Sequence, residues 1–260
     1  MNFQLIGLTF LIAFFSLILL FLYLGIHLAR WHAKKTKTKT NKAAGLQVVE
    51  GAIFALLGLL VAFTFSSANQ RFDSRRHLIT DEANAIVTAY LRIDLTSPEM
   101  QKILRQDFKQ YLAYRLATYK KMPDQEASRL EHKKSLAAQD KIWNVATDIC
   151  KDKDQQRVCM LLIPALNTMF NIANERYANS DLHPPLIIFL LLIGVALLGA
   201  LLAGYDIGEK GKGSILYLMS YALVMAVTVY IIINLEFPRL GFIRLDPFDK
   251  VLIQVHNNMD

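Results

Sequence analysis

The chain has 260 residues, of which 53% are hydrophobic and 20% are charged, and its formal net charge is +7. With only 2 cysteines, 12 glycines and 7 prolines, this composition excludes a disulfide-dense scaffold and a disordered chain. A positive mean hydropathy of +0.29 beside this many charges indicates that apolar and charged residues are segregated along the sequence.

Four long stretches contain no Asp, Glu, Lys or Arg: residues 3–25, 51–66, 186–205 and 214–235. Each reaches or approaches the ~20 apolar residues that cross a ~30 Å hydrocarbon core. In the second stretch uncharged residues continue to Gln70, so a complete span fits there. The first stretch is too long for a signal peptide and lacks a cleavage pattern, so we expect it to be retained. We therefore predict four transmembrane helices in a lipid bilayer.

The segment between the first two spans carries most of the net charge. Residues 26–49 contain no acid and six cations, namely Arg30, Lys34, Lys35, Lys37, Lys39 and Lys42. Short loops rich in Lys and Arg stay in the cytoplasm, although this one could also contact anionic lipid headgroups. The pattern predicts a protein of the bacterial inner membrane whose N-terminus, large insert and C-terminus lie outside.

The insert between the second and third spans is nearly balanced in charge and has helical periodicity throughout. Ser97-Pro98 is typical of a helix start, with an N-cap residue followed by proline. Helices are expected over residues 98–121, 125–149 and 157–177, the last kinked near Pro164. The predicted fold class is all-α, an integral membrane protein with four transmembrane helices and a large helical extramembrane insert. Its predicted parts are the first two spans and the Lys-rich loop (1–66), the extramembrane domain (67–183), the last two spans (184–235) and a C-terminal tail (236–260).

Helix 98–121 combines basic and aromatic residues that could suggest a nucleic-acid surface. They are Lys102, Arg105, Lys109, Tyr111, Tyr114, Arg115 and Tyr119. The balanced charge of the insert, with 18 Lys or Arg and 15 Asp or Glu over residues 67–183, argues against nucleic-acid binding. We interpret these residues as a solvated face with packed tyrosines, and we expect no nucleic-acid partner.

Both cysteines, Cys150 and Cys159, fall within the insert, on either side of the segment KDKDQQRV. A disulfide between them would staple a helix–turn–helix corner, which requires an oxidising compartment and agrees with an outside location. The alternative is two unrelated buried thiols. The nearest histidine, His132, lies outside the usual ligand spacing, so we expect no metal site.

The second span carries a stripe of small and polar residues four positions apart, and the third span carries a stripe of small residues. The first stripe is Gly58, Ala62, Ser66 and Gln70, and the second is Ala196, Ala200 and Gly204. Small residues at this spacing let helices approach closely. Two interpretations stay open: both stripes pack within one chain, or the stripe on the second span faces a symmetric pore.

Three arginines, Arg71, Arg75 and Arg76, follow the second span directly. Guanidinium groups at the mouth of a pore would concentrate anions there. The alternative is snorkelling to the membrane interface together with pairing to nearby carboxylates, which is common at helix ends. The arginines and the stripe on the second span are therefore candidates for a pore and its mouth.

No catalytic constellation is present in the sequence. His77 and Asp81 lie one helical turn apart, but nothing nearby completes a metal site or a nucleophile–base pair. Neither a glycine-rich phosphate loop nor a nucleophile elbow occurs. We expect no enzymatic activity and no cofactor.

The run GLLVAFTFSSANQRFDSRRHLITDEANAIVTAYLRIDL, from Gly58 to Leu95, resembles the signature of the bestrophin-like family of bacterial four-span membrane proteins. The ending NLEFPRLGFIRL, from Asn234 to Leu245, is similar to that family's other marker. The order of two spans, a helical insert and two more spans also matches. The motif residues that the resemblance singles out are Phe72, Glu82, Asn84, Pro238, Arg239 and Gly241.

A more distant similarity is to bestrophins, which are pentameric anion channels. In them an Asn-x-Ala-x-x-Arg-aromatic pattern follows the pore helix; Ala68, Arg71 and Phe72 correspond to it here, but Ser66 stands at the Asn position. Bestrophins also keep the helical domain in the cytoplasm, whereas the charges of this chain place it outside. The resemblance implies a homo-oligomeric ion channel, with anions as the candidate ions. The alternative is a non-conducting sensor or scaffold whose external domain binds an envelope protein partner.

Overall fold

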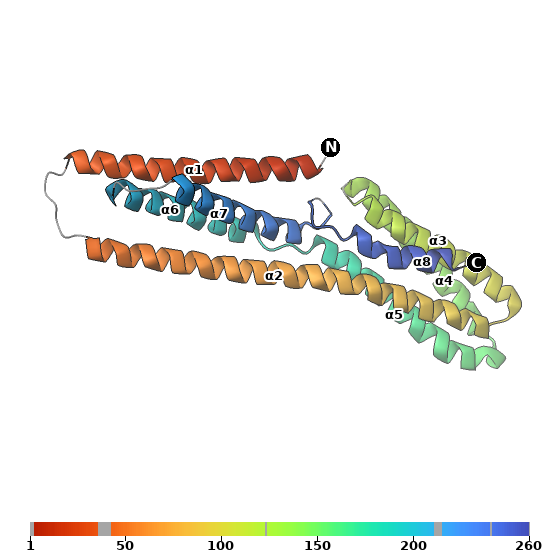
Figure 1. The fold of residues 1–260 in the computed structure, drawn as a ribbon. Coiled ribbons are helices and arrows are strands. Elements are labelled where there is room, and N and C mark those ends of the chain that lie inside the picture. The colour runs from red at the N-terminus through yellow and green to blue at the C-terminus, as the bar shows by residue number, and fades with distance from the viewer. Residues whose placement is uncertain (1–2, 36–42, 123, 211–214, 240, 260) are drawn as a thin grey trace. The chain divides into compact units, whose positions relative to one another are not determined.

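The structure is a computed structural model that describes residues 3–35, 43–122, 124–210, 215–239 and 241–259 (Figure 1). Lys37, Lys39 and Lys42 of the Lys-rich loop lie outside the described residues. Over the described ranges the chain forms helices and short 3₁₀ turns and contains no strand, which confirms the all-α prediction. The α-helices are α1 (Phe3–Lys35), α2 (Ala43–Arg92), α3 (Pro98–Lys120), α4 (Gln125–Ile149), α5 (Gln156–Asp181), α6 (Leu186–Lys210), α7 (Ile215–Glu236) and α8 (Lys250–Asn257).

Four helical stretches are long and apolar enough to cross a membrane, as predicted. They fall within Ile6–Lys34, Val48–Leu95, Lys153–Lys210 and Ile215–Glu236. The chain folds into two compact units, and α2 contributes to both. Unit 1 is Met1–Arg71 with His183–Ile243, and unit 2 is Phe72–Leu182 with Arg244–Asp260.

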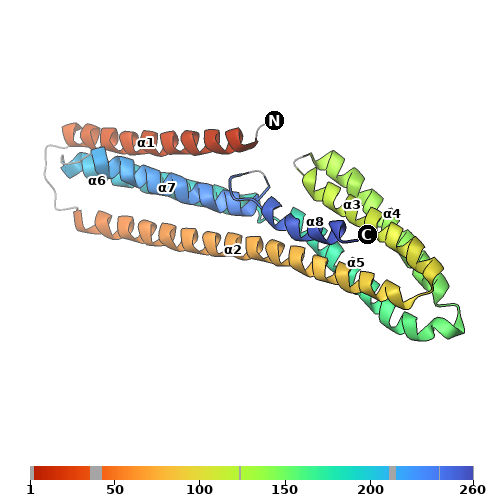
Figure 2. The same cartoon turned by 45° about the vertical axis from the view of Figure 1, so that its right-hand side comes forward.

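Unit 1 is organised around the contact between α1 and α6, which is its most extensive helix pair (Figure 2). Two glycines let the backbones touch. A Cβ on Gly25 would lie 2.1 Å from the carbonyl oxygen of Leu201, and one on Gly204 would lie 2.1 Å from the carbonyl oxygen of Leu22. The stripe of small residues on the third span is buried throughout, so it packs within the chain and does not face a pore.

Helix α2 packs on α6 and α7 through a narrow face. A Cβ on Gly199 of α6 would lie 3.3 Å from Cε1 of Phe54 and 3.4 Å from Cδ2 of Leu57. The Phe54 ring also meets the Tyr221 ring of α7 edge-on, with centroids 6.3 Å apart. Bulky apolar residues of α2 therefore fill the space that a glycine leaves on α6.

Unit 2 is built from the α3–α4 pair, with α5 packed on α4 and α8 packed on α3. Helix α3 begins at the predicted Ser97-Pro98 start, and Asp124 caps α4 by accepting a hydrogen bond of 3.1 Å from the backbone N–H of Ala127. Helix α5 continues through Pro164, which cannot donate a backbone hydrogen bond. In that turn the Arg92 guanidinium donates to the carbonyl oxygen of Leu161.

The contact between α1 and α6 generates the first prediction. Gly204→Ala places a methyl group against backbone atoms that cannot move aside, and overpacking of this kind costs about 1–3 kcal/mol. Gly194→Ala, on the same helix, is the matched control, because a Cβ there meets nothing within 4 Å among the described residues. Chemical denaturation in detergent micelles should show a lower free energy of unfolding for Gly204→Ala and no loss for Gly194→Ala. Equal stability of the two variants would contradict the close backbone contact.

Candidate functional site

The stripe predicted on the second span lies on an open face of α2. Gly58, Ala62, Ser66 and Gln70 are all exposed in the single chain. A Cβ built on Gly58 would meet no described atom within 4 Å. Packing among the helices of one chain therefore does not account for this stripe, in contrast to the buried stripe on α6.

Arg71, at the end of the same stretch of α2, is paired with a buried carboxylate. Its Nε donates to Oε2 of Glu236 at 2.7 Å, and Nδ1 of His183 lies 3.1 Å from Oε1 of Glu236. The Glu236 side chain is fully buried, whereas about a third of Arg71 is exposed. The His183 ring stacks on Phe237, with centroids 4.4 Å apart. One carboxylate thus connects α2 and the segment before α6 to the end of α7.

The other two arginines of the cluster are also engaged within the chain. Arg75 is buried and donates to the carbonyl oxygens of Asn179 at 3.1 Å and Leu182 at 2.8 Å. These carbonyls belong to the last turn of α5 and its C-cap, where carbonyl oxygens lack partners within the helix. Arg76 pairs with Asp73 at 3.3 Å on the surface. Arg75 therefore stabilises the end of α5, and Arg71 and Arg76 form ion pairs within the chain.

The sequence marker that follows α7 forms a compact cap. The Asn234 side chain donates to the carbonyl oxygen of Tyr230 at 2.8 Å and accepts from the backbone N–H of Phe242 at 2.8 Å. A Cβ on Gly241 would lie 1.7 Å from Oδ1 of Asn234, so only glycine fits at this position. Pro238 and Arg239 of the same marker are buried. The residues of this marker are therefore explained by the contacts that the Asn234 side chain makes with the segment after α7.

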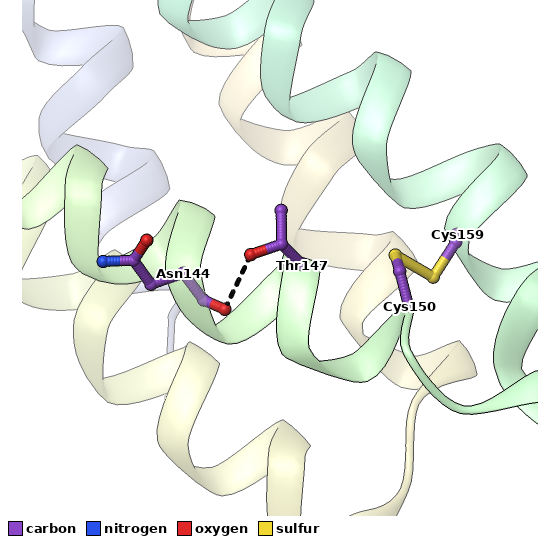
Figure 3. The surroundings of a disulfide bond; sticks show 4 residues. All are labelled: Asn144, Thr147, Cys150 and Cys159. Atoms are coloured by element: carbon purple, nitrogen blue, oxygen red, sulfur yellow. Dashed lines mark hydrogen bonds between the residues drawn. A yellow bond between two sulfur atoms is a disulfide. The ribbon is translucent and has the colours of Figure 1, made fainter.

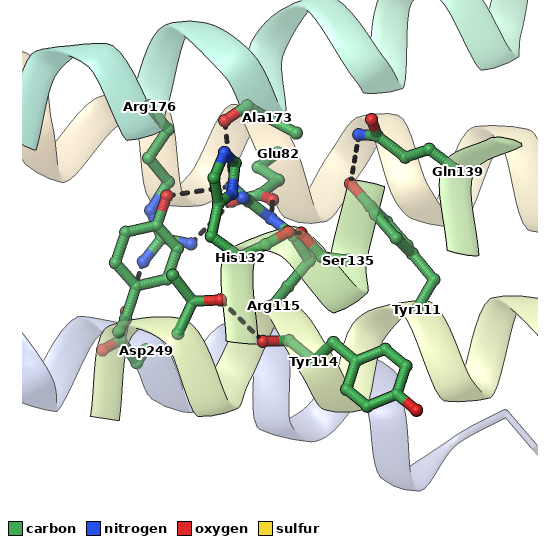
Figure 4. A network of polar contacts seen from close by, with 12 residues as sticks. Glu82, Tyr111, Tyr114, Arg115, His132, Ser135, Gln139, Ala173, Arg176 and Asp249 are labelled. Atoms are coloured by element: carbon green, nitrogen blue, oxygen red, sulfur yellow. Dashed lines mark hydrogen bonds and ion pairs between the residues drawn. The ribbon is translucent and has the colours of Figure 1, made fainter. Parts of the chain in front are cut away.

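Unit 2 contains a buried network of two arginines and two carboxylates (Figure 4). The carboxylate of Glu82 accepts from Nε of Arg115 at 2.6 Å and from Nη1 of Arg176 at 2.6 Å. Arg176 also donates to Asp249 at 2.6 Å, and Arg115 donates to the carbonyl oxygen of Ala173 at 3.0 Å. Glu82, Arg115 and Arg176 are each less than 5% exposed. The two positive and two negative charges balance inside the helical core.

Tyr119 completes this network. Its hydroxyl accepts from Arg115 at 2.9 Å, and the Arg176 guanidinium lies over its ring, 3.6 Å from the centroid. Burial alone would lower the pKa of Arg115, but the negative charge of Glu82, the hydrogen bond to Glu82 and the neighbouring Tyr119 and Tyr111 together raise it. Arg115 is therefore charged in the core, and the interpretation of this helix face as solvated is wrong at Arg115, whereas Tyr111 and Tyr119 are buried, as expected of packed tyrosines. The other two motif residues of α2 differ, since Phe72 is buried and Asn84 is exposed.

Cys150 and Cys159 are joined by a disulfide (Figure 3), with their Cα atoms 5.6 Å apart. Cys150 is the C-cap residue of α4, and Cys159 lies in the first turn of α5. The bond closes the corner between the two helices. Beside it the Thr147 hydroxyl donates to the carbonyl oxygen of Asn144 at 3.0 Å.

Sequence reasoning missed several residues of these clusters: His183, Glu236, Arg176 and Asp249. The sequence does single out Glu236, because it is the first charged residue after the uncharged stretch 214–235. Arg115 also carried one, because it continues the helical spacing of the apolar residues Phe108 and Leu112. Within the described ranges no three His, Cys, Asp or Glu side chains gather in a way that could hold a metal ion.

Four membrane-spanning helices with a helical insert define a multi-pass membrane protein, and comparison with known proteins places it more closely. The model of the Bestrophin-like domain matches residues 10–248. The chain therefore belongs to the Bestrophin-like family. A comparison with curated proteins finds no significant match.

Solved structures show the same fold. A point variant of a bacterial bestrophin homolog from Klebsiella pneumoniae gives a TM-score of 0.70 at 15% identity, covering 97% of this chain and 96% of that one. A second variant of the homolog gives 0.69 at 15% identity, covering 96% and 98%. A structure described as a membrane protein gives 0.67 at 15% identity, covering 96% of each chain. At this identity the similarity establishes the bestrophin fold.

The buried network of unit 2 yields the second prediction. Glu82→Gln removes the negative charge between Arg115 and Arg176, and breaking a buried ion pair from one side costs about 3–5 kcal/mol. Glu175→Gln, an exposed position on α5, is the control and should change stability by less than about 0.5 kcal/mol. Both are measured by denaturation in micelles, followed by circular dichroism. A Glu82→Gln protein as stable as the control would show that the network does not hold the unit together.

Proposed function

We propose that the chain is one subunit of an oligomeric ion channel and that α2 lines the ion pathway. The Bestrophin-like family and fold are known as those of ion channels. The observation that carries the proposal is the open face of α2. Small and polar residues recur along it at helical spacing, and all of them are exposed: Ala62, Ser66, Gln70, Ser74, His77, Asp81, Asn84 and Thr88.

This exposed face supports an oligomer because a single helix cannot enclose a pathway. Several copies arranged around an axis would bring the same face of each α2 together, as closed symmetry requires. Within the membrane a pore wall of small and polar side chains leaves room for an ion and offers it oxygen ligands. The residues on the opposite side of α2 in unit 2, including Ile79, Ala83 and Ile86, are buried and hold the helix in place.

The ion selectivity of such a channel depends on which charges reach the pathway. The contacts of Arg71 with Glu236 and of Arg75 with the end of α5 use these guanidinium groups inside the chain. They give no support to a cationic mouth that attracts anions. We propose that the exposed face of α2 sets the selectivity, where His77 and Asp81 are the ionisable residues.

We further propose that the protein lies in the bacterial inner membrane with the N-terminus, unit 2 and the C-terminus outside. The cations between the first two spans support this orientation, because such loops are retained in the cytoplasm. The disulfide in unit 2 supports it independently, because structural disulfides persist in oxidising compartments.

Cysteine substitution tests the pore wall. Both native cysteines are bonded to each other, so an introduced cysteine supplies the only free thiol. We expect a charged methanethiosulfonate reagent to reduce the current through Ser66→Cys and Gln70→Cys channels in planar bilayers, because it adds bulk and charge to the pathway. Leu223→Cys on α7 is the control, because this residue is 55% exposed but lies on another helix. Its current should not change.

Two results of this experiment would contradict the channel proposal. The first is the absence of any selective current from wild-type protein under all ionic conditions, which would favour the sensor or scaffold alternative. The second is an equal effect of the reagent at Ser66→Cys and Leu223→Cys, which would remove α2 from the wall of the pathway.

Thiol labelling tests the orientation. After mild reduction of spheroplasts, a membrane-impermeant maleimide should label Cys150, because unit 2 is proposed to lie outside. The control is Lys210→Cys in a Cys150→Ser, Cys159→Ser background, which should be labelled only after lysis because Lys210 ends α6 on the proposed cytoplasmic side. Labelling of Cys150 only after lysis would reverse the proposed orientation.

A further inference from the structure

The last part of α1 carries a row of aromatic and cationic side chains on one side of the helix. Each member lies three or four residues from the next along the row, so all of them share that side. They are Tyr23, His27, Arg30, Trp31 and Lys34, and all five are exposed. Leu22 and Ala29, which are buried, mark the opposite side of α1. We call the exposed row the terminal face of α1.

Packing on α6 fixes where the terminal face points. A Cβ on Gly208 of α6 would lie 2.8 Å from Cβ of Ala29, so the two helices stay in close contact up to the residue before Arg30. His32 then meets the ring of Tyr205 on α6 edge-on, with centroids 6.4 Å apart. Because the buried side of α1 is held on α6 in this way, the terminal face is directed away from α6.

Arg30 and Lys34 bring two positive charges close together, one helical turn apart. Neither forms an ion pair with a carboxylate in the described part of the chain. Arg30 is also the first charged residue after the uncharged stretch 3–25. It therefore lies where the span leaves the hydrocarbon core, and long basic side chains at such positions extend into the headgroup region. Two like charges without an acid nearby repel each other, so an anion between them would be stabilised.

The aromatic rings of the terminal face extend from these charges into the span. Tyr23 and Trp31 are 63% and 49% exposed, and the rings of Tyr23 and His27 stack with centroids 6.2 Å apart. Tyr23 lies seven residues before Arg30, which places it about 10 Å deeper along the helix. Tyrosine and tryptophan favour the boundary of the bilayer, because the ring is apolar and its polar group can reach the headgroups.

A phospholipid with a net negative charge matches this arrangement. Its acyl chains would lie at the depth of Tyr23, and its phosphate would lie at the depth of the two cations. In a zwitterionic lipid the positive group of the headgroup offsets the phosphate and leaves both cations uncompensated. An anionic headgroup supplies the missing negative charge.

We propose that the terminal face of α1 binds one anionic phospholipid, whose phosphate lies between Arg30 and Lys34 and whose acyl chain lies along Tyr23. The planar guanidinium group of Arg30 can donate two parallel hydrogen bonds to a phosphate. Trp31 lies beside the upper part of the lipid. The site depends neither on ion conduction nor on which side of the membrane this end of α1 occupies.

Fluorescence quenching tests the site, because Trp31 lies within it and Trp143 is the one other tryptophan of the sequence. The full chain with Trp143→Phe is reconstituted into phosphatidylcholine vesicles that contain a small fraction of brominated phosphatidylglycerol or, in a parallel series, of brominated phosphatidylcholine. We expect phosphatidylglycerol to quench Trp31 more strongly at equal fractions, with a binding constant about 5- to 25-fold higher. A fivefold ratio corresponds to about 1 kcal/mol, the contribution of one Lys or Arg near an anionic surface.

Charge variants supply the matched comparison. Arg30→Gln and Lys34→Gln should each lower the preference for phosphatidylglycerol about fivefold, because each removes one of the two cations. Lys102→Gln, at an exposed position of unit 2, removes the same net charge and should leave the preference unchanged. If Trp143→Phe does not fold, the difference in quenching between wild type and Trp31→Phe isolates the same signal.

Several results would overturn the proposal. Equal quenching by the two brominated lipids would show that the terminal face does not select an anionic lipid, and so would an unchanged preference in both Arg30→Gln and Lys34→Gln. An equal loss of preference in Lys102→Gln would show a general attraction by net charge. Absence of quenching by either lipid would show that protein covers the terminal face.

Discussion

The structure depends on one helix that has to satisfy two different surroundings. Helix α2 runs without interruption over 50 residues and supplies a wall to each of the two units. In unit 1, Phe54 and Leu57 of α2 pack beside Gly199 of α6. In unit 2, an apolar face of α2 that includes Ile79 and Ile86 is buried. Because one side of α2 is buried within the chain, its other side is free to face a neighbouring subunit, an ion pathway or lipid. On that remaining side small and polar residues recur at helical spacing, beside exposed apolar residues such as Leu59 and Phe63.

Buried carboxylates organise the charges around this helix. Glu236 and Glu82 are fully buried; Glu236 accepts from Arg71 and lies 3.1 Å from a ring nitrogen of His183, and Glu82 accepts from Arg115 and Arg176. A buried charge is tolerated only where it is paired and hydrogen-bonded. The two sites thereby fix α2 in both units, the first through Arg71 and the second through Glu82 itself. Arg71 and Arg115, which look like parts of binding surfaces in the sequence, are in the fold partners of these acids.

Much of the fold could be predicted from the sequence because it depends on local patterns. Uncharged stretches predict the spans, and Ser97-Pro98 predicts the start of α3 within one residue. The site could be predicted only in part. The exposure of Ser66 and Gln70 was one of two open interpretations, since spacing alone does not say which face a neighbouring helix covers. The partner of Arg71 was missed because it lies 165 residues further along the chain, and no local pattern connects the two positions.

The ion pair between Arg176 and Asp249 has a consequence for the order of folding. Asp249 and α8 belong to unit 2, but they are synthesised after α6 and α7. Until they arrive, Arg176 lacks one of its two carboxylates and the face of α3 that α8 covers is open. The insert therefore completes its core only after α8 has been synthesised, and α6 and α7 precede α8 along the chain. Closure of the helical unit thus depends on a segment that follows the two later spans in the chain.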